Sequence, residues 1–274
     1  MLASLLIVFR EVIEAGLIIG IVLAATKNAP RRGSWVACGI GGGAFGACLV
    51  AAFAGKIGSL FQGSGQEFFN ASILLIAVAM LTWHNVWMAS HGRTMAGELR
   101  NFGAAVTTGE RTLAALAVVV GVAVLREGSE VVLFLYGIAS QGGTSNGTIL
   151  MGAALGLAAG AVTSVLMYCG LLTIPAHRLF AITSGLITLL AAGMAAQAIL
   201  FVQQGGYLEL LTTTVWDTSW LLPEDSILGR VLHTLVGYTD APDGAQLFIY
   251  AATIVVITTM MRWERSRHPN GTRQ

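Results

Sequence analysis

The sequence predicts an all-helical, multi-pass membrane protein. Of its 274 residues, 55% are hydrophobic and only 11% are charged, whereas a soluble domain carries roughly 25% charged residues. The mean hydropathy is +0.74, and several apolar stretches reach the roughly 20 residues that a helix needs to span a bilayer. These stretches and short loops use nearly the whole length, so residues 1–274 are predicted to form a single membrane domain.

Seven transmembrane helices are expected from the apolar runs between charged or Gly- and Pro-containing breaks. Their approximate ranges are 2–25, 34–61, 67–90, 112–139, 147–173, 177–204 and 246–262. The polar segment from His91 to Arg111 is predicted to be a cytoplasmic loop, with a surface helix as the alternative.

Lysine and arginine are distributed unevenly between the two sides of the predicted bundle. The loops on one side contain eleven basic residues: Lys27, Arg31, Arg32, Arg93, Arg100, Arg111, Arg178, Arg262, Arg265, Arg267 and Arg273. The opposite side contains two, Lys56 and Arg230. Because basic loops stay in the cytoplasm, the N-terminus is predicted to face out and the C-terminus to face in. The basic tail is interpreted as a topology anchor, and no nucleic-acid partner is expected.

Two of the apolar spans contain the same charged motif, R-E-x-x-E. "VFREVIEAGLIIG" lies in the first span and "VLREGSEVVLFLYG" in the fourth, and the motifs begin 116 residues apart. Three spans separate equivalent positions; because three is odd, the second unit crosses the membrane in the opposite direction. This spacing predicts two inverted three-helix repeats, residues 1–90 and 112–204, with a site near the midplane where they meet. The seventh helix, 246–262, lies outside the repeats.

The charges in these motifs indicate a cation site. Six charges at the bilayer centre cost about 15–20 kcal/mol before pairing, at roughly 2.5–3.5 kcal/mol each. One Arg–Glu pair per motif, such as Arg10 with Glu14, would account for a structural role. Four carboxylates against two guanidiniums leave two negative charges, which require a cation or a proton. The glutamates of each motif share one helix face, and carboxylate oxygens suit hard cations. The predicted metal ligands are Glu11, Glu14, Glu127 and Glu130, held in position by Arg10 and Arg126. A structural or proton-relay network is the alternative.

Residues 205–245 are predicted to form an acidic outer loop. Six acidic residues face one arginine there, for a formal charge of about −5, and such a surface raises the local concentration of cations. The alternative is an ordinary solvated loop. His84, in the third span, is open to two interpretations: a ligand or proton relay on the exit path, or a structural hydrogen-bonding histidine.

Two mid-span R-E-x-x-E motifs in spans one and four of a seven-span chain resemble the oxidase-dependent iron transporter family. This family includes the high-affinity iron permeases of fungi and the ferrous-iron uptake permeases of bacteria. The stretch "VWDTSWLLPEDSILGRVLHTLVGY" is similar to the bacterial branch, and because they lie in this stretch, the preferred metal-capturing residues of the outer loop are Asp217, Glu224 and Asp225. The first motif, REVIE, lacks the glycine that is common inside the family's motif, a departure that affects helix packing more than the ligands.

The resemblance implies an iron permease of the cell membrane, in a bacterium the inner membrane. Glu11, Glu14, Glu127 and Glu130 match the family's metal-binding positions. It further implies that a periplasmic or extracellular oxidase or metallochaperone supplies Fe(III), and that iron is the transported substrate rather than a bound cofactor. No permanently bound cofactor is expected.

Two rival functions stay open. A carboxylate site of the same fold would also accept lead, manganese or another divalent ion. Paired intramembrane glutamates also serve as acid and base in enzymes. Membrane glutamate proteases, however, generally place two adjacent glutamates ahead of an arginine, whereas here the arginine comes first. We therefore expect a transporter and not an enzyme.

Overall fold

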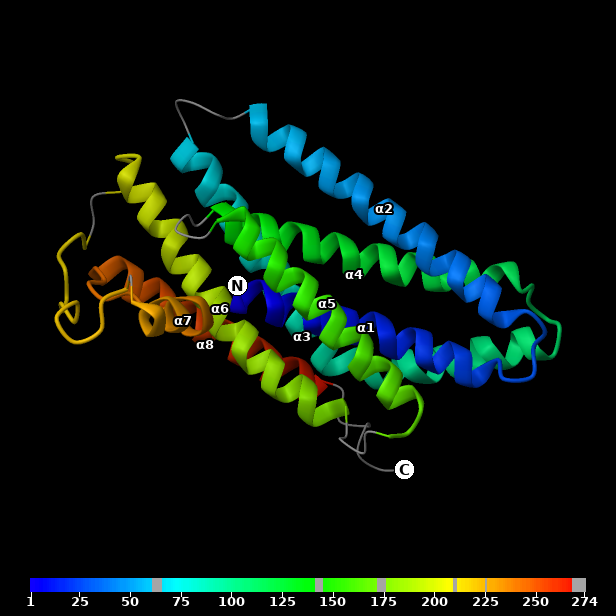
Figure 1. Cartoon of the computed structure of the whole chain (residues 1–274). Helices are drawn as coiled ribbons and strands as arrows, with labels where there is room; N and C mark the ends of the chain where they lie inside the picture. The colour runs from blue at the N-terminus through cyan, green and yellow to red at the C-terminus, as the bar shows by residue number, and fades with distance from the viewer. Residues whose placement is uncertain (61–65, 141–144, 172–175, 209–210, 225, 268–274) are drawn as a thin grey trace.

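The computed structural model describes residues 1–60, 66–140, 145–171, 176–208, 211–224 and 226–267, and in this part of the chain helices are joined by turns and irregular segments, with one isolated β-bridge. Its helices, drawn in Figure 1, are α1 (Leu2–Ala25), α2 (Arg32–Leu60), α3 (Gln66–Thr107), α4 (Ala114–Ser140), α5 (Asn146–Tyr168), α6 (Ala176–Gln204), α7 (Ile227–Val236) and α8 (Gly244–Arg267). The predicted all-helical class is confirmed.

Five helices in the described part are long and apolar enough to cross a bilayer: α2, α3, α5, α6 and α8. The two motif helices, α1 and α4, have 24 and 27 residues but carry three charged residues each. Large apolar side chains lie exposed on the outside of the bundle, as at Phe45, Phe53 and Leu150, whereas the four motif glutamates are buried. This arrangement suits a protein that is solvated by lipid. The seven spans and the N-out orientation stay predictions.

The segment His91–Arg111 is helical over most of its length, so the loop prediction was wrong there and its alternative, a helix, is nearer to the structure. α3 continues without interruption to Thr107, for 42 residues, a length of about 63 Å at 1.5 Å per residue. Leu99, Phe102 and Val106 fall on one face of this extension and pack around Val22 near the end of α1. The polar composition of the segment concealed this apolar stripe, whose i, i+3, i+7 spacing is helical.

The acidic outer loop contains a helix that the sequence analysis did not predict. Ser226 caps the start of α7: its hydroxyl accepts a hydrogen bond from the backbone N–H of Gly229, 2.9 Å away. Gly237 caps the end, with a φ of 70° in the left-handed region that glycine adopts without strain. Tyr250 of α8 donates a hydrogen bond from its hydroxyl to the Val236 carbonyl (2.6 Å), which fixes this end against the bundle.

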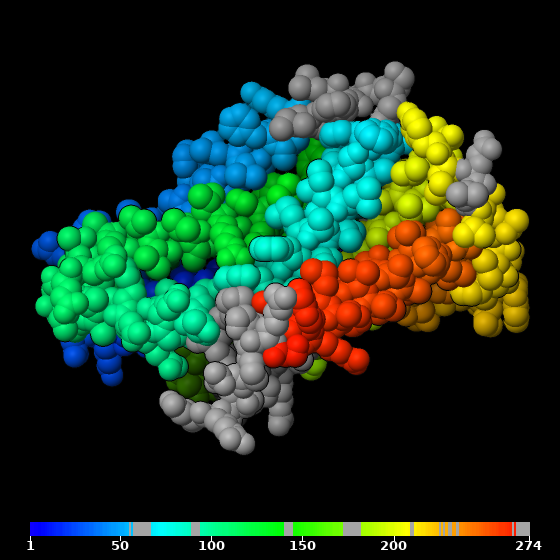
Figure 2. Space-filling view, turned by 180° about the vertical axis from the view of Figure 1, so that it is seen from behind, coloured from blue at the N-terminus to red at the C-terminus, as the bar shows by residue number. Residues whose placement is uncertain are grey.

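The two predicted repeats are interleaved rather than side by side. α1 makes its most extensive contact with α5, and α4 makes its own with α2. α3 packs against α6, and α8 packs against both; Figure 2 shows α8, in orange and red, beside α3, in cyan. Each motif helix therefore packs against the second helix of the other repeat, α1 against α5 and α4 against α2.

Glycines permit the two closest helix pairings. A Cβ atom at Gly156 of α5 would lie 2.5 Å from the carbonyl oxygen of Leu5, and one at Gly43 of α2 would lie 2.6 Å from that of Gly121. Such contacts are too short for a side chain, so the helices approach to a distance that only glycine allows. These glycines of α2 and α5 therefore have a packing role.

Candidate metal centre

The first motif lies on the inner face of α1, where all three of its charged side chains are buried. Nη1 of Arg10 donates a hydrogen bond to Glu11 (3.0 Å), and Nη2 lies 2.9 Å from Glu14. The pair of Arg10 with Glu14 expected from the i,i+4 spacing is therefore present. A guanidinium that contacts both carboxylates holds their relative position and offsets part of their charge.

The second motif, on α4, is arranged differently. Nε of Arg126 lies 3.2 Å from Glu130 and 3.9 Å from Glu127. Its guanidinium carbon lies 4.7 Å from the ring centre of Trp87 on α3, a cation–π contact. The Arg126 side chain is 39% exposed, against 3% for Arg10. Each arginine thus pairs with glutamates of its own motif, but Arg10 is buried and Arg126 is partly exposed.

His84 of α3 lies between the motifs. Its Nε2 is 2.8 Å from Glu14 and 4.0 Å from Glu11, and its Nδ1 is 2.5 Å from Glu130. The ring is 2% exposed. One imidazole therefore contacts carboxylates from both halves, so His84 belongs to the centre rather than to a path beyond it.

Four side chains converge at this point. One ligand atom from each of Glu11, His84, Glu127 and Glu130 lies within 4.8 Å of the others. It is the one group of three or more such ligands in the described part of the chain. Glu14, also a predicted ligand, is beside the group and contacts His84 and Arg10 instead.

The centre is buried and carries more negative than positive charge. If all groups are ionised, four carboxylates face two guanidiniums and, when protonated, one imidazolium. Oε2 of Glu11 and Oε2 of Glu127 are buried without a hydrogen-bond partner in the described part. Buried carboxylate oxygens with no donor are costly, and a bound cation or a shared proton would satisfy them.

The residues predicted for metal capture in the outer loop are placed apart from this centre. Asp217 is exposed, and its carboxylate accepts hydrogen bonds from the hydroxyl (2.6 Å) and the backbone N–H (2.9 Å) of Ser219, which lower its pKa. Glu224 lies 3.0 Å from Nδ1 of His233 on α7. Asp225 lies outside the described residues.

The sequence profile of the iron permease FTR1 family matches residues 1–265. The chain belongs to this family. It is 31% identical to the ferrous iron permease EfeU of Escherichia coli O157:H7 over 263 residues, which cover 93% of this chain and 94% of the relative. It is 30% identical to EfeU of Yersinia pestis over 254 residues, or 91% and 89% of the two chains. No solved structure matches the chain.

Membership of the FTR1 family, together with the apolar helices, makes this a multi-pass protein of the cell membrane. The family predicted from the paired motifs is confirmed over essentially the whole chain. The charge pattern alone indicated the four glutamates as candidate ligands, since a charged residue within an apolar span is costly unless it is paired or binds an ion. His84 gave a weaker signal, because one neutral imidazole in a span has no spacing that ties it to motifs 70 and 46 residues away.

Proposed function

We propose that this FTR1-family protein is an iron permease that carries Fe(III) across the cytoplasmic membrane through the buried centre between α1, α3 and α4. The observation that carries the proposal is the convergence of Glu11, Glu127 and Glu130 with His84 within 4.8 Å. Carboxylate oxygens suit a hard trivalent ion, and an imidazole nitrogen is a common iron ligand.

The charge of the centre supports a metal rather than a purely structural network. A structural pair would use one glutamate per arginine, as Arg10 does with Glu14 and Arg126 with Glu130. Glu11 and Glu127 are then in excess, and their Oε2 atoms are buried without a hydrogen-bond partner among the described residues. Oε1 of Glu14 and Oε2 of Glu130 are also buried, but they lie against Arg10 and His84. Excess carboxylates in a dry interior need a cation or protons, and an incoming metal ion supplies that charge.

The position of the centre suits transport. Its ligands come from both predicted repeats, and the site lies where the repeats meet, as in transporters built from inverted halves. Movement of one half relative to the other would change the distance between Glu11 on α1 and Glu127 on α4. The ion would thus be bound tightly in one arrangement and released in another.

We further propose that the acidic outer segment receives iron from a periplasmic or extracellular oxidase or metallochaperone. Asp217 is exposed and remains ionised, because the hydrogen bonds from Ser219 lower its pKa. An ionised, solvent-facing carboxylate attracts cations and increases their rate of arrival.

Two alternatives would use the same residues. A permease for lead, manganese or Fe(II) needs no change in the fold, and the relatives are named as ferrous iron permeases. An intramembrane enzyme with glutamates as acid and base is the other; the contact of Glu14 and Glu130 with one histidine favours it in part. Family membership favours transport.

The deciding experiment is metal flux into proteoliposomes that contain the purified protein, supplied with Fe(III), Fe(II), Mn(II) or Pb(II). Glu11→Gln and Glu127→Gln keep the side-chain size and remove the excess charge. We expect flux of iron that falls by at least tenfold in each variant, because one charged ligand bond is worth more than about 1.4 kcal/mol. Glu110→Gln, at an exposed glutamate after α3, is the matched control and should transport as the unaltered chain does.

Iron flux that is unchanged in both variants would return the motifs to a structural role. A higher flux for manganese or lead than for iron would move the assignment to that ion. Should no metal cross even with an oxidase partner added, while a membrane substrate is cleaved independently of metal, the enzyme alternative would replace the permease.

A further inference from the structure

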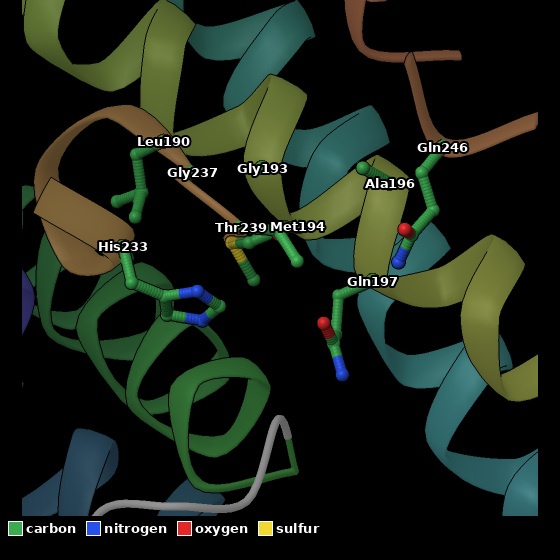
Figure 3. Close-up of a pocket in the computed structure, with 9 residues that line it drawn as sticks. All are labelled: Leu190, Gly193, Met194, Ala196, Gln197, His233, Gly237, Thr239 and Gln246. Atoms are coloured by element: carbon green, nitrogen blue, oxygen red, sulfur yellow. The ribbon is translucent and has the colours of Figure 1, made fainter. Parts of the chain in front are cut away.

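A second group of polar side chains faces a small pocket between α6, α7 and the start of α8. The pocket has a volume of about 10 Å³, room for a single water molecule or ion. Figure 3 shows the His233 ring and the side-chain amides of Gln197 and Gln246 reaching toward it from three separate helices. In the predicted orientation, this end of α6 lies toward the outside.

The local structure fixes the orientation of His233. Its Nδ1 lies 2.8 Å from the carbonyl oxygen of Tyr238 and 3.0 Å from Glu224. Because both partners accept hydrogen bonds, Nδ1 carries the proton, and in the neutral ring Nε2 is a lone-pair donor. Nε2 has no hydrogen-bond partner among the described residues. Metal-binding histidines are typically held in this way, with one nitrogen donating to a carboxylate or carbonyl and the other free for the metal.

The amides around the ring are suited to complete a coordination shell. Gln197 is half-buried and makes no hydrogen bond in the described part of the chain, so its amide oxygen is available. Gln246 is buried, and its Oε1 accepts a hydrogen bond from the backbone N–H of Asp243 (3.0 Å). Its NH₂ group therefore stays available to donate to a metal-bound water.

The pocket forms because α7 approaches α6 through two glycines. A Cβ atom at Gly193 would lie 2.7 Å from Cα of Gly237, so neither position accommodates a larger residue without a shift. This contact places His233, four residues before Gly237, beside Gln197, four residues after Gly193. One helical turn on each side of the contact thus brings the imidazole and the amide together.

An apolar layer separates the pocket from the glutamate centre. Ile7 lies four residues before Glu11, Leu81 three residues before His84, and Phe134 four residues after Glu130. In the predicted orientation all three lie one turn outward from the centre. They are fully buried and belong to one core cluster, which also contains the pocket-lining residues Leu190 and Met194. An ion in the pocket therefore meets a closed apolar layer before it reaches the glutamates.

We propose that this pocket is an outer binding station for the transported iron ion, with Nε2 of His233 and the amide oxygen of Gln197 as its protein ligands. The station rests on the proposed function for its place in transport. It holds the ion next to the layer formed by Ile7, Leu81 and Phe134 until that layer opens. Its neutral ligands bind more weakly than the charged glutamates, so an ion passes inward with a gain in affinity.

The test is equilibrium binding of Fe(II) to the full chain in lipid nanodiscs under anaerobic conditions, because uncomplexed Fe(III) precipitates near neutral pH. The parent for comparison carries Glu11→Gln with Glu127→Gln, which removes binding at the midplane. We expect two iron sites in the unaltered chain and one in this parent.

His233→Asn in that parent is the decisive variant. The Asn amide nitrogen takes the place of Nδ1, so it keeps the hydrogen bonds to Tyr238 and Glu224 but offers no nitrogen at Nε2. We expect binding to weaken by at least tenfold. Gln197→Leu tests the second ligand independently and should weaken binding severalfold, whereas Gln204→Leu, at an exposed amide at the end of α6, should leave binding unchanged.

The station is rejected if the parent binds no iron, or if His233→Asn and Gln197→Leu bind iron as the parent does. In either case iron flux through the unaltered chain can persist, and only the station fails. If instead His233-dependent binding is found but no iron crosses the membrane, the proposed permease function fails and the pocket stands as a metal site.

Discussion

His84 joins the two motif helices through both of its ring nitrogens, one to Glu14 on α1 and one to Glu130 on α4. To donate a hydrogen bond to each carboxylate the ring must carry two protons and hence a positive charge. When no cation is bound, it then offsets a third carboxylate of the four, which leaves the centre with a net charge of −1. A single residue from a third helix thus lowers the electrostatic cost of the centre.

Replacement of His84 should therefore destabilise the protein strongly. His84→Leu fills the space but leaves Glu14 and Glu130 without their buried partner, and we expect a loss of about 3–5 kcal/mol in the free energy of unfolding. His84→Gln, which can still donate to one glutamate, should lose less. Thermal unfolding in detergent measures both; equal stability of His84→Leu and the unaltered chain would contradict the ionic role.

The site residues differ in how far the sequence could predict them. The six motif charges were predictable because an apolar span tolerates them only for a reason. His84 and His233 were not, because their roles depend on contacts that no spacing encodes: carboxylates on two other helices for His84, and the Tyr238 carbonyl for His233. A histidine's function is decided by what each nitrogen faces.

Among the helices, the length of α3 could not be predicted from the apolar pattern. Apart from α3, apolar runs located the long helices to within about five residues, since a bilayer limits the length of an apolar run. The extension of α3 beyond His91 was missed because it is held by packing on α1 and α4 rather than by overall hydrophobicity. The pairing of the helices could not be predicted from the sequence either, because the apolar periodicity of a helix defines its buried face but not the helix that covers that face.

The close contact of α1 with α5 is testable at Gly156. Gly156→Leu would place side-chain atoms against the backbone of Leu5 and Phe9, and overpacking of this kind costs about 1–3 kcal/mol or more. We expect a lower unfolding temperature and weaker iron binding, because α1 carries Glu11. Gly41→Leu, on a face of α2 where a Cβ atom meets nothing within 4 Å, is the control and should be neutral. A neutral Gly156→Leu would show that the helices can separate without loss.

At the scale of the whole molecule, the predicted orientation places the acidic segment and α7 outside and the end of α3 inside. Labelling of single cysteines tests this orientation. Asp217→Cys and Glu110→Cys are made separately in a chain from which Cys38, Cys48 and Cys169 have been replaced. In intact cells a membrane-impermeant maleimide should label position 217, and it should label position 110 only after permeabilisation. The reverse pattern would invert the protein and place the His233 pocket on the cytoplasmic side.

The interleaved pairing of α1 with α5 also sets an order of events during synthesis. About 120 residues separate the end of α1 from the start of α5, so at roughly 5–20 residues per second the ribosome needs on the order of 10 s to supply the partner. His84 and the glutamates of α4 are synthesised within that interval, but α5 is not, so the face of α1 that packs on α5 stays uncovered until its end. A chain truncated before Asn146 contains both motifs and His84 but leaves this face of α1 open, and quality-control proteases would meet it in that state.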